Sequence, residues 1–281
     1  MIDPQIDHDY NARESVDDFD VEYGKLLDIS AQVRAELPAQ TDLVFDPESG
    51  SALDLYHAGP NTPVFLWIHG GYWRIGDKEG NAFAAPGLVA GGVSVAVMDY
   101  SLAPAVSLEQ IVHEVRTAVA WLHREGAALG IATNKIHVGG SSAGGHLTGA
   151  VLADGWRSDY GLPRDMIGAA LALSGIYDLD PLTKTRVNEW MNMDAGTVAA
   201  LSPIRHIPDQ TDAHLILSVG GLERDGFLRE TQAYGDAWSA KGHRLHRVEM
   251  AAYNHFDITS TLTQADGALV TATLAAIAEL S

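Results

Sequence analysis

The sequence predicts an α/β fold with a mainly parallel central sheet that helices cover on both faces. Short continuous apolar segments, such as 64–69 (VFLWIH) and 93–98 (VSVAVM), are typical of strands buried on both faces. Longer segments between such strands, for example 108–125, carry apolar residues at helical spacing. The sequence contains no internal repeat or low-complexity linker, and its composition does not change after residue 60. We therefore expect one domain over residues 1–281.

The expected elements follow one another in a regular order. A helix at 20–37 comes first, and Pro38 ends it. The expected strands are 43–45, 53–57, 64–69, 93–98, 136–138, 167–173, 214–219 and 243–250. Further helices are expected at 108–125, 146–156, 227–240 and 265–280. Strands that alternate with amphipathic helices predict parallel pairing, because a parallel crossover needs a long connection.

The chain is strongly acidic, and its composition excludes several classes of function. It has 37 Asp and Glu against 18 Lys and Arg, a net charge of −19, so nucleic acid and anionic membranes are not expected partners. It has no cysteine, which excludes disulfides, a thiol nucleophile and zinc sites with sulfur ligands. No apolar stretch reaches the roughly 18 residues of a membrane span. We expect a cytoplasmic protein that binds a small molecule, and the sequence is compatible with a homo-oligomer.

The acidic residues are concentrated at the start of the chain. Residues 1–54 hold 14 acidic and 3 basic residues, a net charge of −11. The first 20 residues hold seven acids and one base, unlike the basic start of a secretory signal. One interpretation of residues 1–40 is a solvated face that aids solubility. The other is that this acidic segment, with its helix at 20–37, is part of a cap over a pocket.

The segment 139–145 (GGSSAGG) contains the pattern G-x-S-x-G with Ser142 at its centre. The pattern alone is weak, but here it follows a short apolar strand and opens a helix, as a nucleophile elbow requires. The glycines allow the sharp turn and leave the serine uncrowded. The start of the helix directs backbone N–H groups at the site, which favours a developing negative charge.

A second glycine pair, in His69-Gly70-Gly71, follows the strand at 64–69. Two glycines after a strand can direct two N–H donors at one point, which is what an oxyanion needs during acyl transfer. We therefore expect Gly70 and Gly71, together with the N–H of Ala143, to form an oxyanion hole. His69 is expected to support the loop and not to be the catalytic base.

A serine nucleophile needs a base, and His255 is the best candidate among the 12 histidines. It lies after the last expected strand and before the last helix, at the same sheet edge as the elbow. The orienting carboxylate is expected on the loop after strand 214–219, where Glu223 and Asp225 are both candidates. Asp257 is too close to His255 in sequence to reach its far nitrogen easily, and we expect it to be a helix N-cap.

The motifs together resemble the α/β-hydrolase family. They are HGGYW (69–73), MDYSLAP (98–104), GGSSAGG, SGIYDLDPL (174–182), the loop with Glu223, and NHF (254–256), in this order. Within that family the chain is similar to the kynurenine formamidase (arylformamidase) branch, a neighbour of the hormone-sensitive-lipase-type esterases. HGG followed by Tyr-Trp points to the formamidase side. Glu223 and Ser101 depart from the pattern, because relatives often have Asp and Arg there.

The resemblance implies an α/β-hydrolase fold and a serine hydrolase without a cofactor. It implies Ser142 as nucleophile, His255 as base and Glu223 as triad acid, with Asp225 as the rival for that last role. The implied substrate is a small amide, foremost an N-formyl aryl amide such as N-formylkynurenine. A short-chain carboxylester is the alternative, which would make the chain a carboxylesterase. A non-catalytic ligand receptor on the same fold is a third interpretation, disfavoured because the candidate triad is complete.

Pocket residues are harder to assign from the sequence. Trp73 and Tyr177 lie just after strand-end motifs and are candidates for an aromatic-accepting substrate pocket. Trp190 is a candidate cap residue. No metal site is expected, because the histidines lack HExxH spacing and no acidic calcium loop is present.

Overall fold

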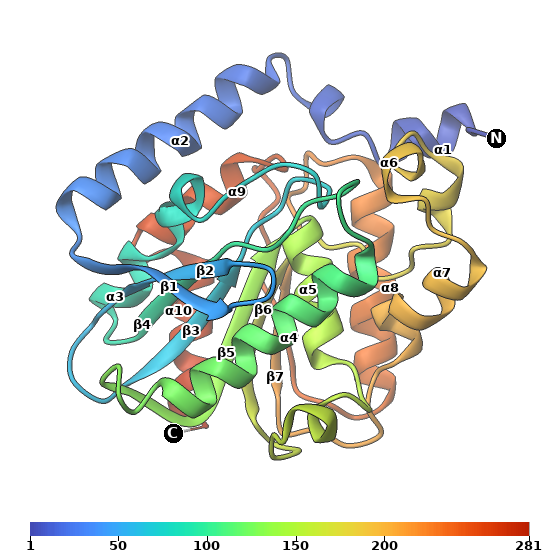
Figure 1. The fold of residues 1–281 in the computed structure, drawn as a ribbon. Coiled ribbons are helices and arrows are strands. Elements are labelled where there is room, and N and C mark those ends of the chain that lie inside the picture. Colours follow the sequence, from blue (N-terminus) through green and yellow to red (C-terminus); the bar gives the residue numbers. More distant parts are fainter. Residues whose placement is uncertain (281) are drawn as a thin grey trace.

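The computed structural model describes residues 1–280. Its centre is an eight-stranded sheet with the strand order β1-β2-β4-β3-β5-β6-β7-β8 (Figure 1). The strands are Ala39–Asp46 (β1), Ser51–Tyr56 (β2), Thr62–Ile68 (β3), Ser94–Met98 (β4), Ile131–Ser141 (β5), Ile167–Leu173 (β6), His214–Ser218 (β7) and Leu245–Arg247 (β8). β2 is antiparallel to both of its neighbours, and all other neighbouring strands are parallel. The α/β-hydrolase fold and its mainly parallel sheet are thus as the sequence predicts.

Helices cover both faces of this sheet (Figure 1). The α-helices are Pro4–Asp9 (α1), Phe19–Glu36 (α2), Pro86–Ala90 (α3), Leu108–Glu125 (α4), Ala143–Leu152 (α5), Asn188–Met191 (α6), Ala195–Leu201 (α7), Asp225–Ala240 (α8), Asp257–Ser260 (α9) and Ala268–Ala278 (α10). α4, α5 and α8 pack on one face, and α3 and α10 pack on the other. Six short 3₁₀ turns lie in the loops within residues 1–280.

The alternation of side chains along β3 builds two cores, one on each face. Val64, Leu66 and Ile68 point into the core under α4, α5 and α8. Phe65 and Trp67 point into the core under α3 and α10. All five side chains are buried, as expected for a central strand of a parallel sheet. This packing on both faces fixes the carboxyl ends of the strands, which carry the candidate site.

The N-terminal segment (residues 1–38) runs across the carboxyl edge of the sheet (Figure 1). Its long helix α2 buries Leu26 and Val33 in the second core. Ser30 is also buried, and its hydroxyl donates to the carbonyl of Gly80 at 2.8 Å. The expected helix at 20–37 is confirmed, and it lies against the 3₁₀ turn Glu79–Ala84.

The main differences from the sequence expectation concern the ends of elements and the short helices. β5 begins five residues earlier than expected, and β8 has only three residues of the expected eight. α1 was not expected, since its apolar spacing is weak; Asp3 caps it by accepting from the N–H groups of Gln5 and Ile6. The expected role of Asp257 as an N-cap is wrong. It is the first residue of α9, and its carboxylate accepts from the N–H of Asn254.

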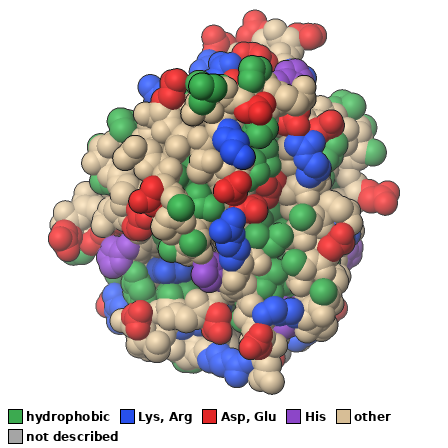
Figure 2. Space-filling view, turned by 90° about the vertical axis from the view of Figure 1, so that its right-hand side faces the viewer, with side chains coloured by type: hydrophobic (Ala, Val, Ile, Leu, Met, Phe, Trp, Pro, Cys, Tyr) green, Lys and Arg blue, Asp and Glu red, His purple; other side chains and the backbone are tan. Residues whose placement is uncertain are grey.

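Charged side chains are interspersed on the face that carries α1, α6, α7 and α8 (Figure 2). Acidic groups of the N-terminal segment find partners there. Asp7 contacts Arg186 at 2.8 Å, and Asp9 contacts Arg229 at 2.6 Å. These pairs hold α1 against the loop before α6 and against α8. Within residues 1–280, no helix is long and apolar enough to cross a membrane.

Candidate active site

Ser142 lies at a sharp turn between β5 and α5. Its backbone has φ 59° and ψ −119°, a conformation that non-glycine residues rarely adopt. Its N–H donates to the carbonyl of Leu173 on β6 at 2.9 Å, which holds the turn to the sheet. The glycines are needed for space: a Cβ on Gly140 would lie 2.5 Å from the carbonyl oxygen of Ile68, and one on Gly144 would lie 2.0 Å from it. Such strain at a strand-to-helix turn is typical of a nucleophile elbow.

The loop after β3 lies directly beside this serine. A Cβ on Gly70 would lie 2.9 Å from the carbonyl oxygen of Ser141 and 3.3 Å from the Cβ of Ser142. Gly71 has φ 98°, which favours glycine. In the described part of the chain, the N–H groups of Gly70, Gly71 and Ala143 donate no hydrogen bond to a protein acceptor. These three donors are therefore available to a ligand beside Ser142.

His69 and Tyr100 support that loop from below. The two rings stack with centroids 4.0 Å apart. The Nδ1–H of His69 donates to the carbonyl of Gly70 at 2.8 Å, and the hydroxyl of Tyr100 donates to the carbonyl of His69 at 3.0 Å. Burial lowers the pKa of His69 to about 4, so its ring is neutral near pH 7. A buried neutral ring of this kind stiffens the loop and is poorly placed to be a base.

His255 and Glu223 come from the loops after β8 and β7. The Nδ1–H of His255 donates to Oε2 of Glu223, and the two atoms are 2.5 Å apart. The other carboxylate oxygen of Glu223 accepts from the hydroxyl of Ser174 at 2.5 Å and from the N–H of Gly220 at 2.7 Å. The bond at Nδ1 leaves Nε2 of His255 without a proton in the neutral ring, so that nitrogen can accept one.

The structure separates the two candidate carboxylates. Glu223 is buried and bonded to the imidazole, whereas Asp225 is the exposed first residue of α8. A turn leads into Glu223, whose N–H donates to the carbonyl of Gly220 at 3.1 Å, whereas Asp225 already begins α8. Among the described residues, Asp225 forms no hydrogen bond or ion pair with His255.

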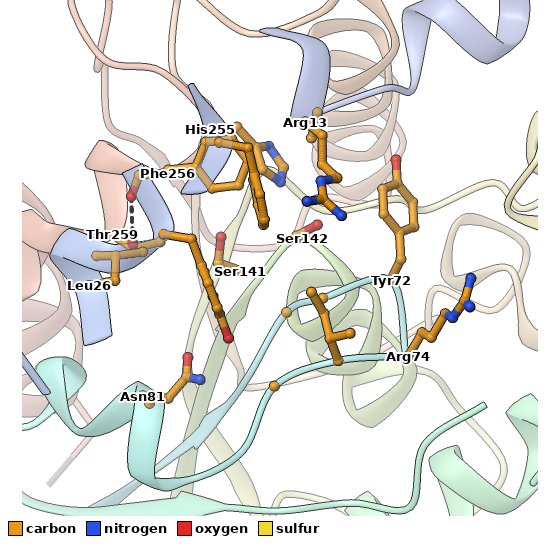
Figure 3. Close-up of a pocket in the computed structure, with 18 of the residues that line it drawn as sticks. Arg13, Leu26, Tyr72, Arg74, Asn81, Ser141, Ser142, His255, Phe256 and Thr259 are labelled. Atoms are coloured by element: carbon orange, nitrogen blue, oxygen red, sulfur yellow. Dashed lines mark hydrogen bonds between the residues drawn. The ribbon is translucent and has the colours of Figure 1, made fainter. Parts of the chain in front are cut away.

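Ser142, His255, Gly70 and Gly71 line one cavity of about 430 Å³. Figure 3 shows the imidazole of His255 directed toward the hydroxyl of Ser142. The walls of the cavity are largely aromatic and aliphatic. They are formed mainly by Phe19, Tyr23 and Leu26 of α2, by Trp67 and Phe83, by Tyr72 and Ile75, and by Trp190 and Phe256.

Trp73 and Tyr177 do not line this cavity, and their expected role as pocket residues is wrong. Both side chains are completely buried. The ring of Trp73 packs edge-on against His146 with centroids 5.1 Å apart, and Tyr177 stacks on Tyr234 at 4.1 Å. Tyr72, next to Trp73 in sequence, is the aromatic residue of that loop that reaches the cavity.

Several wall residues were not predicted from the sequence. Phe19 and Tyr23 lie one turn apart on α2, and their rings stack with centroids 5.4 Å apart. Their helical spacing is visible in the sequence, and so is the apolar face of the helix. The sequence does not reveal what that face covers, because the covered loops lie more than 40 residues further along the chain.

The remaining buried histidines have structural partners. Nε2 of His146 bonds the carbonyl of Leu201 at 2.9 Å, and Nδ1 of His137 accepts from the N–H of Ala169 at 2.9 Å. Burial lowers the pKa of each ring to about 4. Over residues 1–280, no group of three or more His, Asp or Glu residues is arranged to hold a metal ion.

An eight-stranded, mostly parallel sheet with a strained serine at a strand-to-helix turn defines the α/β-hydrolase class. The sequence model of the BD-FAE family matches residues 53–221, more than half of the chain, so the chain belongs to the BD-FAE family. This stretch includes most of β2, all of β3 to β7, the Gly70–Gly71 loop and the Ser142 turn.

The chain is similar to relatives and solved structures that are named as hydrolases. Kynurenine formamidase of Danio rerio is 28% identical over 242 residues, which are 83% of this chain and 80% of that protein. Kynurenine formamidase of Salmo salar is 29% identical over 83% of this chain and 81% of its own length. A candidate thioesterase of Silicibacter sp. tm1040 superposes with a TM-score of 0.83 at 27% identity, covering 97% of this chain and 99% of its own. The chain is a hydrolase, and its similarity to kynurenine formamidases is confirmed.

Proposed function

We propose that the protein is a serine hydrolase that cleaves a small amide, foremost an N-formyl aryl amide such as N-formylkynurenine. The observation that carries this proposal is the 2.5 Å bond between Glu223 and His255, in a site where His255 and Ser142 line one cavity. In this proposal Ser142 is the nucleophile, His255 is the general base, and Glu223 orients the imidazole and stabilises its cation.

In the acylation step, Nε2 of His255 takes the proton of the Ser142 hydroxyl as Oγ attacks the substrate carbonyl. The carbonyl oxygen becomes an oxyanion, which accepts hydrogen bonds from the N–H groups of Gly70, Gly71 and Ala143. These donors are preorganised, because strand ends hold both loops before the substrate arrives. Collapse of the intermediate breaks the carbonyl–nitrogen bond, and His255 gives its proton to the leaving amine.

The deacylation step repeats the same chemistry with water. His255 removes a proton from a water molecule, whose oxygen attacks the acyl carbon on Ser142. The same three N–H groups hold the second oxyanion. His255 then returns the proton to Oγ of Ser142 as the acyl group leaves as a carboxylic acid, formate for an N-formyl substrate. Only the neutral imidazole can start either step, so we expect activity to fall in acid.

Two observations support an aryl amide as the substrate. The cavity walls are lined by aromatic side chains from α2 and from the loops after β3, where a flat ring can stack. Relatives over most of the chain are kynurenine formamidases. The alternative substrate is a short-chain ester, which the same residues would cleave by the same steps. The likeness to a candidate thioesterase favours keeping this alternative.

The test is a comparison of substrates with the purified full chain. We expect kcat/KM for N-formylkynurenine to exceed kcat/KM for 4-nitrophenyl acetate, and we expect a chelator to leave both unchanged. Preference for the ester would move the assignment to a carboxylesterase. Absence of turnover, together with absence of labelling by a fluorophosphonate, would contradict the serine mechanism and favour a ligand receptor. The cytoplasmic location and the homo-oligomer stay predictions.

A further inference from the structure

The charge of the cavity is opposite to that of the protein. The chain has 37 acidic against 18 basic residues. The described residues that line the cavity nevertheless include two arginines, Arg13 and Arg74, and no Asp or Glu. The low-dielectric walls between these arginines strengthen their field inside the cavity. The charged side chains that line the cavity are therefore cationic, and the nearest buried carboxylate, that of Glu223, is bonded to His255.

Arg13 comes from the N-terminal segment and lines the cavity with Ser142 and His255 (Figure 3). Its guanidinium is directed into the cavity, toward the hydroxyl of Ser142. It is also the one base among the first 20 residues, which hold seven acids. Most acids of that stretch lie elsewhere on the surface, whereas this single cation points into the site.

The contacts of Arg13 leave it free to bind a ligand. Its Cζ lies 3.9 Å from the ring centroid of Phe19, a cation–π contact that orients the plane of the guanidinium. Its ion pair with Asp20 is 3.5 Å long, and the two side chains are 63% and 88% exposed. A pair this exposed contributes little. A ligand carboxylate can therefore take the N–H groups of Arg13 in its place.

The segment that carries Arg13 is held in place just before it. The hydroxyl of Tyr10 donates to the buried carboxylate of Glu230 at 2.7 Å, and the hydroxyl of Tyr72 donates to the carbonyl of Tyr10. Tyr72 belongs to the loop that carries Gly70 and Gly71. Arg13 is thus positioned relative to the oxyanion loop, although it lies more than 50 residues earlier in the chain.

Arg74 is the second cation but is placed differently. Its Cζ lies 4.9 Å from the ring centroid of Trp190. Figure 3 shows its guanidinium turned away from Ser142. It adds to the positive field at the wall, and Arg13 is the group in position to bind directly.

We propose that Arg13 binds the carboxylate of the substrate, which makes Arg13 a specificity-determining residue. This inference rests on the proposed function of the same cavity, because N-formylkynurenine carries a carboxylate, and it assigns to Arg13 the selection of such acids over neutral aryl amides and esters. The planar guanidinium matches a carboxylate with two parallel N–H···O bonds, while the aromatic walls hold the ring. Neutral aryl amides and esters lack this contact and bind more weakly.

The test measures binding without turnover, in the full chain with Ser142→Ala. The two ligands are 4-oxo-4-phenylbutanoate and its primary amide, which share an aromatic ketone and differ in charge. Calorimetric titration gives both dissociation constants for this parent protein and for versions that add Arg13→Gln, Arg13→Lys or Arg124→Gln. Arg124 is exposed at the end of α4 and outside the cavity, so Arg124→Gln is the control for the change in net charge.

We expect the parent protein to bind the carboxylate about tenfold more tightly than the amide. This ratio is at the lower end of the range for a hydrogen bond between charged groups, because Arg13 is partly exposed to solvent. Arg13→Gln should reduce this preference to about twofold or less. Arg13→Lys should retain part of it, and Arg124→Gln should retain all of it. Raising the salt concentration should weaken carboxylate binding more than amide binding.

Equal binding of the two ligands by the parent, or absence of carboxylate binding, would overturn the inference. So would a preference that persists in Arg13→Gln. These outcomes are separate from failure of the proposed function, which would appear as absence of turnover and of phosphonate labelling in the protein with Ser142 intact. Circular dichroism of each variant checks that it is folded.

Discussion

The carboxyl edge of the sheet and the N-terminal segment meet at the same cavity, but different interactions hold them there. The edge is held by backbone bonds: the N–H of Ser142 donates to Leu173, and the N–H of Ser174 donates to Ser218, each at 2.9 Å. The N-terminal segment is held largely by side chains, such as the pairs Asp7–Arg186 and Asp9–Arg229.

This difference suggests that the sheet edge determines the rate and that the N-terminal segment determines substrate binding. Backbone bonds between strands do not depend on ionisation, so they suit the groups whose geometry decides the rate. Side-chain pairs can be changed one at a time without disrupting the sheet, so they suit the groups that select the substrate. We therefore expect changes at the edge to lower kcat, and changes in the N-terminal segment to act mainly on KM.

The largest difference is expected between Glu223→Gln and Asp225→Asn. Glu223→Gln should lower turnover by about 10⁴-fold, because it favours the wrong imidazole tautomer in His255. Asp225→Asn should change it only a few-fold, since Asp225 is exposed at the start of α8. The measurement is the turnover of each single variant, with folding checked by circular dichroism. A severe loss in Asp225→Asn would reassign the acid.

A smaller effect is expected for the oxyanion loop in Gly71→Ala. The new Cβ would lie 2.0 Å from the carbonyl oxygen of Ile75, at a backbone φ of 98°, so the loop must move. Loss of one oxyanion donor typically costs about 10² to 10³ in kcat. Gly130→Ala is the matched control, because Gly130 has φ 78° and open space around it. Similar kcat losses in both variants would contradict a special role for Gly71.

The anchor of the N-terminal segment gives a still smaller effect. Tyr10→Phe keeps the ring that packs on Phe227 but removes the hydroxyl that bonds Glu230. We expect KM to rise several-fold with kcat nearly unchanged, because the segment loosens while the edge stays in place. Tyr160→Phe removes a hydroxyl that bonds His113, away from the cavity, and should change neither constant. A drop in kcat with unchanged KM in Tyr10→Phe would contradict the assignment of the N-terminal segment to substrate binding.

The two regions should also respond differently to acid. Burial lowers the pKa of His69, His137 and His146 to about 4, so the unfolded chain binds these protons first. Their contribution to stability is present above about pH 6.5 and is lost as the pH falls toward 4. Burial raises the pKa of Asp99 to about 6 and also raises the pKa of Glu230. The folded chain therefore takes up these two protons before the unfolded chain does, which favours the folded state as the pH falls.

The three histidines outnumber these two acids, so we expect the unfolding free energy to fall as the pH decreases from about 6.5 toward 4. The pairs that hold α1 respond at lower pH. Burial disfavours the carboxylates of Asp7 and Asp9, but the bonds to Arg186 and Arg229 outweigh it and lower both pKa values. Their contribution is lost only below about pH 4. Urea unfolding at several pH values measures the slope, and a stability that rises on acidification would contradict this assignment.

Much of the sheet and of the loops at its carboxyl edge could be predicted from the sequence, because the sequence patterns that indicate them are local. The apolar segments give the strands, and the glycines around Ser142 and after His69 indicate turns at strand ends. Parallel strands then bring these ends to one edge, with His255 on a loop at the same edge. The choice between Glu223 and Asp225 could not be made from spacing, because both follow the same strand. In the structure Glu223 is bonded to His255, whereas Asp225 begins α8.

The position of the N-terminal segment depends on contacts between residues that are distant in the sequence. Asp7 meets Arg186 at a separation of 179 residues, and Tyr10 meets Glu230 at a separation of 220. No local pattern encodes such pairs, so the sequence left open whether the first 40 residues are a solvated face or a cap. Trp73 and Tyr177 show the same limit: a position after a strand-end motif does not decide whether a ring faces a cavity or the core.

The most direct test of the central claim is labelling with a fluorophosphonate, followed by intact mass and peptide analysis. We expect one label per chain, on Ser142, with complete loss of esterase or amidase activity. Ser142→Ala should take no label and should lose about 10⁴ to 10⁶ in turnover while remaining folded. A label on Ser141 with Ser142 unmodified, or an active Ser142→Ala protein, would contradict it.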